Sequence, residues 1–403
     1  MRFQLRAAVV AALAGLATSA QAQAQAESIF SLSGFGTVGV VGTSKDGAEY
    51  VVPSQIRGAD KSWSGEVDSK LGVQMGARFN RQFSATVQVL SKQDGKGRFT
   101  PQIEWAFAKW QATPGLAVRA GRMGGPFFAV SDFRDVGYAN TWLRPPIDVY
   151  GQVPVSHFDG ADLSWQTSVA GKALTLQVIG GRSSSYVERT KVEIDSLVGF
   201  NATIELVDGL SLRLGHVTGK LTVNSGSLND LVGVLRRTPF AGVGNQLDPN
   251  DKRASFSGLG LTYDQGNWIV LAEYTKRKTE TFIPDTTGWY TTLGYRVGKF
   301  TPYATLSRLK TDDSNVTNTI PGSVVLPGMQ APLRAYVDGA TAAQSTPQKT
   351  IGLGVRWDGL RNVAVKAQID SIKTTGAGQF YNADASFSNK RVNVYSLAVD
   401  FVF

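Results

Sequence analysis

The sequence predicts an all-β fold, a closed, 16-stranded antiparallel transmembrane β-barrel. Long loops are expected at its extracellular end and short turns at its periplasmic end, with the third loop folded into the lumen. Three observations predict this fold: an export signal, recurring segments that alternate apolar and polar residues, and connections that alternate between short and long.

The N-terminus has the pattern of a secretory signal peptide over residues 1–26. Arg2 and Arg6 precede an apolar run from Ala7 to Ala17, which is shorter than the roughly 20 residues that a spanning helix needs. Cleavage sites with small residues follow Ala22, Ala24 and Ala26. A retained N-terminal anchor is the alternative. We expect residues 27–403 to form the barrel domain.

Composition agrees with an exported barrel. The chain has 403 residues and no cysteine, so its rigidity must come from something other than disulfides, and a closed hydrogen-bonded sheet supplies it. The formal net charge is +9. Export argues against nucleic acid as the partner of this charge. A basic lumen, or loops that face anionic lipopolysaccharide, explains it better, and a merely solvated surface remains an alternative.

The predicted strands are defined by their alternation. Residues Leu71, Val73 and Met75 alternate with Gly72 and Gln74, as expected where one face meets lipid and the other meets a polar lumen. The predicted strands cover residues 28–43, 66–79, 82–92, 101–111, 115–122, 158–168, 172–181, 193–206, 209–219, 253–264, 266–277, 287–297, 299–310, 347–357, 361–374 and 390–403.

The connections between these segments alternate in length without exception. The long ones cover residues 44–65, 93–100, 123–157, 182–192, 220–252, 278–286, 311–346 and 375–389. A soluble β-sandwich has no reason to segregate its loops in this way, whereas a barrel with short periplasmic turns does. The even strand count places both chain ends on the periplasmic side.

The last strand ends in alternating apolar residues with Phe401 and Phe403. This ending is typical of the signal by which the barrel insertion machinery recognises its clients, although any amphipathic strand that ends in Phe has the same appearance.

The sequence predicts no catalytic residue, no metal site and no cofactor. His157 and His216 are the only histidines, and neither lies in a recognisable catalytic signature. Asp248–Asp251 has oxygen ligands that Ca²⁺ could use, but a polar turn explains it better.

The third long connection carries the predicted functional site. It is too aromatic to stand in solvent, so we expect it to fold against the inner barrel wall and to narrow the lumen. Packing outside, against a neighbouring subunit, is the alternative. The predicted constriction residues are Pro126, Phe127, Phe128, Asp132, Arg134, Asp135, Tyr138, Trp142, Arg144 and Asp148.

Charged residues on the lumen face of the strands are expected to oppose this loop and to create a transverse field that filters solutes by charge. The basic ones are Lys70, Arg119, Arg213, Arg296 and Lys366, and the acidic ones are Glu104, Asp162, Glu205 and Asp370. Arg78, Arg356 and Asp400 are expected near the periplasmic rim, away from the constriction. Counting these three residues as well, bases outnumber acids by seven to five, which favours anions, although a one-residue register slip would change the count.

The chain resembles the Gram-negative porin superfamily of sixteen-stranded trimeric barrels. The resemblance lies in Leu32–Gly36, in Leu116–Arg122 leading into the third loop, and in the terminal Phe403. General porins usually carry a Pro-Glu-Phe-Gly-like stretch in this loop, where this chain has Gly125–Phe128, so it resembles a divergent branch. The resemblance implies a homotrimer whose second long loop, residues 92–100, reaches toward a neighbouring subunit.

The leading functional hypothesis is a Gram-negative outer-membrane channel for passive diffusion of ions and small hydrophilic solutes, with charge filtering at the constriction loop. A substrate-selective channel for organic acids or sugars is the alternative, and an outer-membrane enzyme or adhesin is a third possibility. The expected partners are two further copies of the chain, outer-membrane lipid and lipopolysaccharide, the insertion machinery and the solutes.

Overall fold

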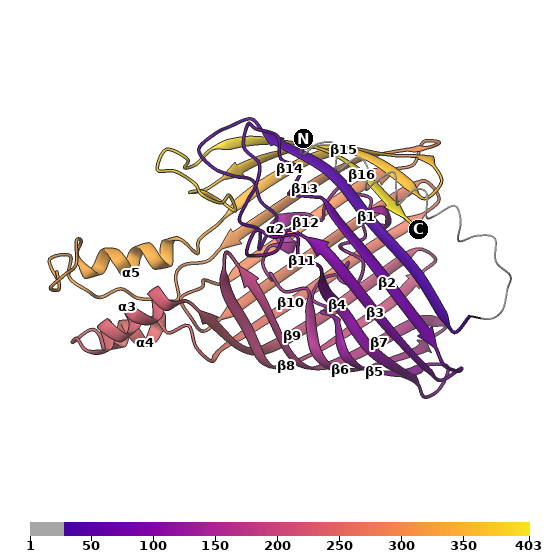
Figure 1. Ribbon diagram of the computed structural model, residues 1–403, viewed down its shortest axis with the longest axis horizontal. Helices are drawn as coiled ribbons and strands as arrows, with labels where there is room; N and C mark the ends of the chain where they lie inside the picture. Colours follow the sequence, from indigo (N-terminus) through magenta and orange to yellow (C-terminus); the bar gives the residue numbers. More distant parts are fainter. Residues whose placement is uncertain (1–27) are drawn as a thin grey trace.

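The computed structural model describes residues 28–403, which form a closed antiparallel barrel of sixteen strands (Figure 1). Each strand pairs with its neighbours along the chain, and β1 pairs with β16 to close the barrel. The predicted strand number and topology are confirmed; the predicted signal peptide lies outside the described residues. The strands are β1 (Phe30–Thr43), β2 (Lys70–Arg78), β3 (Phe83–Lys92), β4 (Gln102–Gln111), β5 (Leu116–Gly124), β6 (His157–Val169), β7 (Lys172–Val187), β8 (Thr190–Val207), β9 (Leu210–Asn224), β10 (Lys252–Gln265), β11 (Trp268–Thr279), β12 (Thr286–Tyr295), β13 (Phe300–Thr311), β14 (Gln348–Leu360), β15 (Val363–Thr374) and β16 (Arg391–Val402).

The two ends of the barrel differ. Tight turns join the strands at one end, which we call the turn end, and longer connections lie at the other, the loop end (Figure 1). The loops at the loop end are L1 (44–69), L2 (93–101), L3 (125–156), L5 (225–251), L6 (280–285), L7 (312–347) and L8 (375–390).

The outer face of the barrel is apolar and bordered by aromatic rings. Phe83, Trp268 and Phe403 are about half exposed near the turn end, whereas Tyr274 and Trp289 are exposed nearer the loop end. Between these two levels the outward positions are occupied by residues such as leucine and valine. This arrangement is an apolar band between two aromatic girdles.

One connection differs from the prediction. Residues 182–192 were expected to form a long loop, but β7 and β8 continue through them and meet at a two-residue turn, Glu188–Arg189, where both residues have positive φ. Such a turn matches the twist of paired strands. The polar residues here were misleading because this end of the hairpin extends beyond the apolar band and needs no lipid-facing side chains.

Within residues 28–403, helices occur only at the loop end and in L3. L5 contains α3 (Gly226–Arg236) and α4 (Ala241–Leu247), and L7 contains α5 (Leu333–Ala342). Their apolar sides share one buried cluster. L3 contains the short helices η1 (Gly137–Ala139) and α2 (Ile147–Tyr150). Of the helices in residues 28–403, none has the length and apolar character needed to cross a membrane.

Three glycines lie side by side across β5, β6 and β7. Gly121 pairs with Gly160, and Gly160 pairs with Gly181. A Cβ atom on Gly160 would lie 2.1 Å from the backbone oxygen of Gly180, and one on Gly121 would lie 2.2 Å from that of Ala106. Because the obstructing atoms are backbone, no side-chain rotation can relieve the clash. The glycine row therefore permits a close backbone approach in the barrel wall next to the start of L3.

We predict that Gly160→Ala destabilises the folded barrel by about 1–3 kcal/mol, the usual cost of overpacking. The urea midpoint of refolded protein, followed by heat-modifiable migration on gels, measures this change. The matched control is Gly180→Ala, because the nearest atom to a Cβ there is 4.0 Å away. Equal midpoints for the two variants would contradict the close approach.

Candidate functional site: the lumen and its third loop

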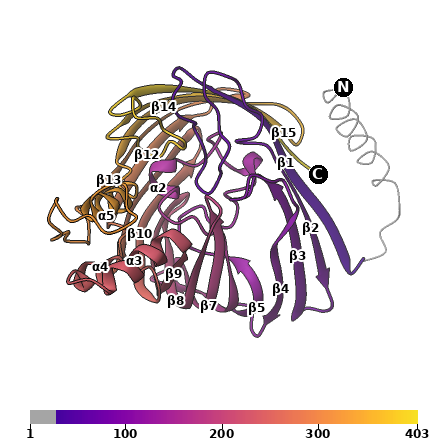
Figure 2. The same ribbon diagram turned by 60° about the vertical axis from the view of Figure 1, so that its left-hand side comes forward.

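L3 lies inside the barrel. Figure 2 shows α2 and the coil around it within the ring of strands. The loop leaves β5, crosses to the wall formed by β9–β11, runs past β1 and β16, and returns to β6. Its inward placement, expected from its aromatic content, is visible in the contacts described below.

The aromatic side chains of L3 are buried against the wall. The Phe128 ring stacks on Tyr150 at 4.5 Å between centroids and meets Phe256 of β10 edge-on at 5.1 Å. Trp142 is also buried, and its Nε1 donates to Thr292 of β12 at 2.7 Å. These rings therefore hold the loop in place and do not line a path for solutes.

Two charged residues of L3 that were predicted to line the constriction are instead buried between the loop and the barrel wall. Arg144 donates to both carboxylate oxygens of Asp68 in L1, at 2.9 and 2.7 Å, and to Ser396 of β16 at 2.6 Å. Its second ion pair is with Asp370 of β15 at 3.4 Å. Asp148 is fully buried and accepts a hydrogen bond from Ser307 of β13. The two ion pairs neutralise the charge of Arg144.

The predicted wall residue Lys366 of β15 also belongs to this buried set. Its ammonium donates to the backbone oxygens of Gly137, Asn140 and Trp142 at 2.6–2.7 Å. It also pairs with Asp400 of β16 at 2.9 Å, and both side chains have no exposed surface. An ammonium with three carbonyl partners and one carboxylate has all of its hydrogen-bonding capacity used.

The expectation that Arg356 and Asp400 lie away from the constriction loop was wrong. Arg356 of β14 donates to the backbone oxygens of Tyr138 and Asn140 at 2.7 and 2.9 Å, and its guanidinium lies over the Tyr138 ring. Asp400 contacts the same loop segment through Lys366. L3 lies closer to the turn end than its attachment to β5 suggests. Side chains near the turn end therefore contact it.

The start of L3 is attached to the wall opposite β5. Arg213 of β9 donates to the backbone oxygen of Pro126 at 2.5 Å, and Glu273 of β11 accepts from the Ala129 amide at 2.9 Å. Arg213 also donates to Asn201 of β8. The predicted wall base Arg213 is therefore a further anchor of the loop.

A second group of charges remains partly exposed to the lumen. Asp135 of L3 accepts from Lys92 of β3 at 2.8 Å, with Lys70 of β2 at 3.8 Å and Arg134 at 3.9 Å. Burial opposes ionisation of Asp135, but the three cations outweigh it and hold its pKa below the usual range. We call these four residues the charged cluster. One carboxylate faces three bases, so the cluster is net positive at neutral pH.

Beside the charged cluster, Arg119 of β5 forms an ion pair with Asp162 of β6. Both residues face the lumen, as predicted, and Gln177 of β7 also donates to Asp162, at 2.7 Å. Asp132 of L3 lies in the field of Arg119. Burial raises the pKa of Asp132, and the charge of Arg119 partly offsets that rise.

Of the remaining predicted wall residues, Arg296 and Glu205 lie away from the constriction, whereas Glu104 lines the same cavity as Lys92 and Asp135. Arg296 lies beyond the end of β12, exposed, and pairs with Asp264 at 2.7 Å near the turn end. Glu205 of β8 accepts from the Gly209 amide in the adjacent turn. Glu104 lies at an irregularity between β3 and β4, buried beside His157 at 3.8 Å.

On the loop-end side of L3, the lumen is divided into two compartments. Residues 53–55 of L1 and 153–154 of L3 line both cavities and touch one another, since Ser54 donates to the backbone oxygen of Pro154 at 3.3 Å. We call this contact the L1–L3 bridge. The smaller compartment, about 450 Å³, contains the charged cluster, and the larger, about 960 Å³, lies against β8–β11.

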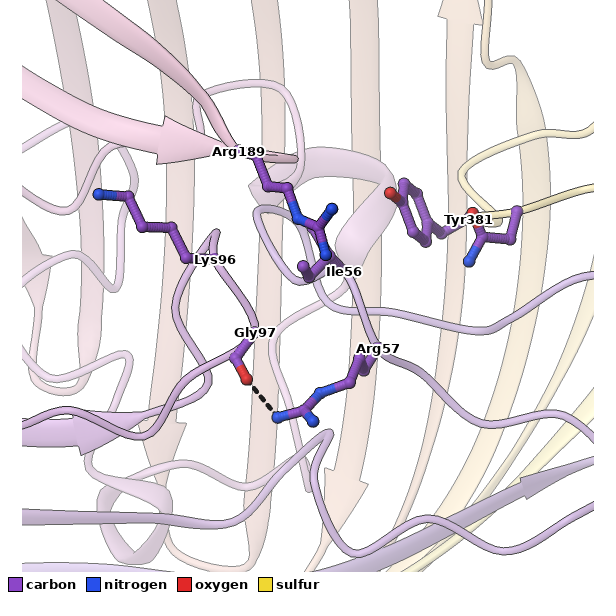
Figure 3. Close-up of a pocket in the computed structure, with 7 residues that line it drawn as sticks. Ile56, Arg57, Lys96, Gly97, Arg189 and Tyr381 are labelled. Atoms are coloured by element: carbon purple, nitrogen blue, oxygen red, sulfur yellow. Dashed lines mark hydrogen bonds between the residues drawn. The ribbon is translucent and has the colours of Figure 1, made fainter.

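A basic pocket of about 330 Å³ lies at the mouth, where L1, L2, the β7–β8 turn and L8 meet (Figure 3). Arg57, Lys96 and Arg189 line it, and Arg57 donates to the backbone oxygen of Gly97 in L2. The Arg189 amide donates to Gly95 at 2.7 Å. L2 therefore contacts L1 and the β7–β8 hairpin of its own chain, and its implied reach toward a neighbouring subunit stays a prediction.

The two histidines have different surroundings. His157 Nδ1 lies 3.2 Å from the Ser156 hydroxyl and 3.8 Å from Glu104. His216 faces outward from β9 and hydrogen-bonds Ser257 of β10 at 2.8 Å, beside the Phe200 ring. Among residues 28–403 no carboxylate pairs with His216, so the arrangement lacks the third group that orients a catalytic imidazole.

Sequence reasoning missed several residues of the site. Lys92 and Glu273 lie on the inward faces of β3 and β11, so the alternation of these strands contained the signal for both. Ser54 belongs to L1, where no periodicity indicates which side chain meets L3. Asp68, which the sequence placed in the strand 66–79, lies at the end of L1 because β2 begins only at Lys70. Their roles depend on the path of a loop.

Solved structures with the same fold are porins and outer-membrane channels. The anion-selective porin from Comamonas acidovorans is 14% identical, with 93% of this chain and 99% of that chain covered and a TM-score of 0.54. Salmonella typhi OmpF, solved with daunomycin, is 15% identical, with coverage of 93% and 97% and a TM-score of 0.54. The outer-membrane channel DcaP of Acinetobacter baumannii is 11% identical, with coverage of 94% and 99% and a TM-score of 0.55.

No curated protein sequence matches the chain. The Gram-negative porin family, however, matches it over residues 7–402, nearly its whole length. The family match, the closed barrel and the lumen loop agree on a multi-pass channel of the outer membrane. This chain therefore belongs to the Gram-negative porin family.

Proposed function

We propose that the protein is a passive channel for ions and small hydrophilic solutes, and that its charged cluster filters them by charge. The observation that supports the filter is the grouping of Lys70, Lys92 and Arg134 around the single carboxylate of Asp135, all partly exposed to the lumen. Fixed charges at a narrow point change the local concentration of mobile ions of each sign.

The filter should favour anions. The cluster has three bases and one acid, so two positive charges remain after Asp135 is neutralised. Arg57, Lys96 and Arg189 add further positive charge at the mouth. The sequence also favoured anions, but on a count that included Lys366, Arg213 and Arg356. These three hold L3 in place, so the preference now rests on different residues.

Of the two selective alternatives, organic acids have more support than sugars. A sugar pathway needs a series of exposed aromatic rings, whereas Phe127, Phe128 and Trp142 are buried, and Tyr138 is covered by Arg356. Carboxylates suit a lumen whose exposed charges are mainly basic.

We also propose that the chain assembles as a homotrimer through its first and last strands and is inserted by the barrel insertion machinery. The outward face of β1 supports the first part, because Phe30, Leu32 and Val38 are more than half exposed there. Phe401 and Phe403 of the expected insertion signal lie against Gly36 and Gly34 of β1, where they close the barrel.

Lipopolysaccharide is the proposed lipid partner, and a row of cations supports it. Arg308 of β13 lies directly opposite Lys349 of β14, Lys349 lies opposite Lys373 of β15, and Lys373 lies opposite Arg391 of β16. All four are exposed on the outer face near the loop end. Like charges directly opposite one another destabilise a sheet, so anionic phosphate groups would relieve the repulsion.

We predict that Lys92→Gln shifts the channel toward cations and that Asp135→Asn shifts it toward anions. Each should change the chloride-to-potassium permeability ratio roughly two- to fivefold, since a unit charge near an ion in water is worth about 1 kcal/mol. Reversal potentials in a KCl gradient across planar bilayers measure the ratio. Arg296→Gln, at the turn end, is the control. The filter is wrong if all three variants match the unaltered channel.

We predict that Lys349→Gln combined with Lys373→Gln weakens the retention of lipopolysaccharide by about 2 kcal/mol, at about 1 kcal/mol per interfacial cation. Native mass spectrometry of protein extracted from outer membranes measures the bound glycolipid. Lys310→Gln is the control, because Lys310 is already paired with Asp312 at 3.0 Å. Equal retention by the double variant and the control would count against the cation row.

A further inference from the structure

The two compartments above L3 have different chemistry. Charged side chains from several elements line the smaller one, among them Lys92, Asp94, Glu104, Arg134, Asp135 and Lys191. The larger one has only two charged lining residues among those that the structure describes, Glu188 and Arg277. A pore for small hydrophilic solutes needs no second compartment of this kind, so the larger one calls for an explanation.

Apolar side chains enclose the larger compartment on three sides. Inward residues of the barrel wall form one side, with Leu197, Val217 and Phe256 buried there. Phe127 and Val155 of L3 form the floor. On the side away from L3, Leu228 of α3 and Tyr336 of α5 complete the lining. Water is poorly held by such surfaces, so a solute with an apolar body gains by replacing it.

Arg277 of β11 supplies the one cation of this compartment. Its two terminal nitrogens donate to the backbone oxygens of Gln152 in L3 and Pro284 in L6, at 2.9 and 3.1 Å. Its Nε is buried and has no hydrogen-bond partner within residues 28–403, where Arg277 also makes no ion pair. The two carbonyls therefore fix the orientation of the guanidinium, whose positive charge is not neutralised by an ion pair. Each of its two terminal nitrogens keeps a second N–H for a ligand in the cavity, whereas the buried Nε does not face it.

We propose that the larger compartment is a binding site for monocarboxylates with an apolar, ring-sized body. The carboxylate meets Arg277, and the ring lies against the β8–β10 wall and Phe127. The volume of about 960 Å³ accommodates such a solute together with water. The L1–L3 bridge separates this site from the charged cluster, so inorganic ions and aromatic acids enter by different sides of the mouth. The proposal rests on the channel function and narrows its substrate class.

Current block in planar bilayers tests the site, with sodium phenylacetate as the probe in KCl. Sodium acetate and neutral 2-phenylethanol are the matched probes that lack the ring and the charge. We expect phenylacetate to block at a concentration about tenfold lower than either, with block expressed as a fraction of each channel's own KCl current. Equal block by all three probes would overturn the proposal.

Substitutions in the larger compartment show where phenylacetate binds. Arg277→Gln should raise the blocking concentration of phenylacetate about tenfold, and Arg277→Lys should restore most of the block. If Arg277→Gln does not fold, the isosteric pair Val217→Thr and Val223→Thr tests the apolar wall and should weaken the block by phenylacetate but not by acetate. Arg296→Gln, at the turn end, is the control and should leave the phenylacetate block in place. Unchanged block in Arg277→Gln, or loss of block in Arg296→Gln, would refute the site.

The outcome separates this inference from the channel function. A wild-type protein without KCl conductance would contradict the channel itself. A conducting protein that phenylacetate blocks no better than acetate would contradict only the compartment's role.

Discussion

The structure of the lumen depends on the buried contact between Lys366 and the middle of L3. A lysine with no exposed surface is stable as a cation only when all of its hydrogen bonds are made and its charge is paired. Here three loop carbonyls accept the hydrogen bonds and Asp400 supplies the opposite charge. The contact fixes L3 to β15 and β16. Arg356 of β14 and Arg213 of β9 attach it elsewhere on the wall, and Arg144 pairs with Asp68 of L1. The position of L3 determines where the charged cluster, the L1–L3 bridge and the two compartments lie.

Most of the barrel could be predicted from the sequence, because lipid on one side and water on the other impose a period of two on every strand. The exception was the β7–β8 hairpin, which extends beyond the lipid and so lacks the apolar alternation there. Glu188 and Arg189 carry no turn signal of the Asn-Gly kind, which left the tight connection undetected. The charges on strand faces were also largely predictable, since Lys70, Arg119 and Asp162 lie where the alternation places them.

The site was less predictable, because periodicity says which face a side chain is on and not what covers it. Lys366, Asp370 and Arg213 face inward as expected, but L3 covers or contacts them, so they act as anchors. The aromatic content of L3 correctly indicated that it must pack against the wall. The depth of the loop could not be read from its sequence, and this is why Arg356 and Asp400 were assigned to the rim. The L1–L3 bridge joins residues about 100 positions apart, through loops without any repeat.

The most direct test of this account is a double-mutant cycle at Lys366 and Asp400, measured by urea unfolding and by single-channel recording. Removing one partner of a buried pair usually costs about 3–5 kcal/mol, and replacing both by apolar residues recovers much of it. We therefore expect Lys366→Met alone to destabilise the barrel and to make the channel current noisy. Lys366→Met with Asp400→Leu should recover stability but not the steady current, because the three loop carbonyls still lack a donor. A Lys366→Met channel with unchanged stability and a steady current would contradict the account.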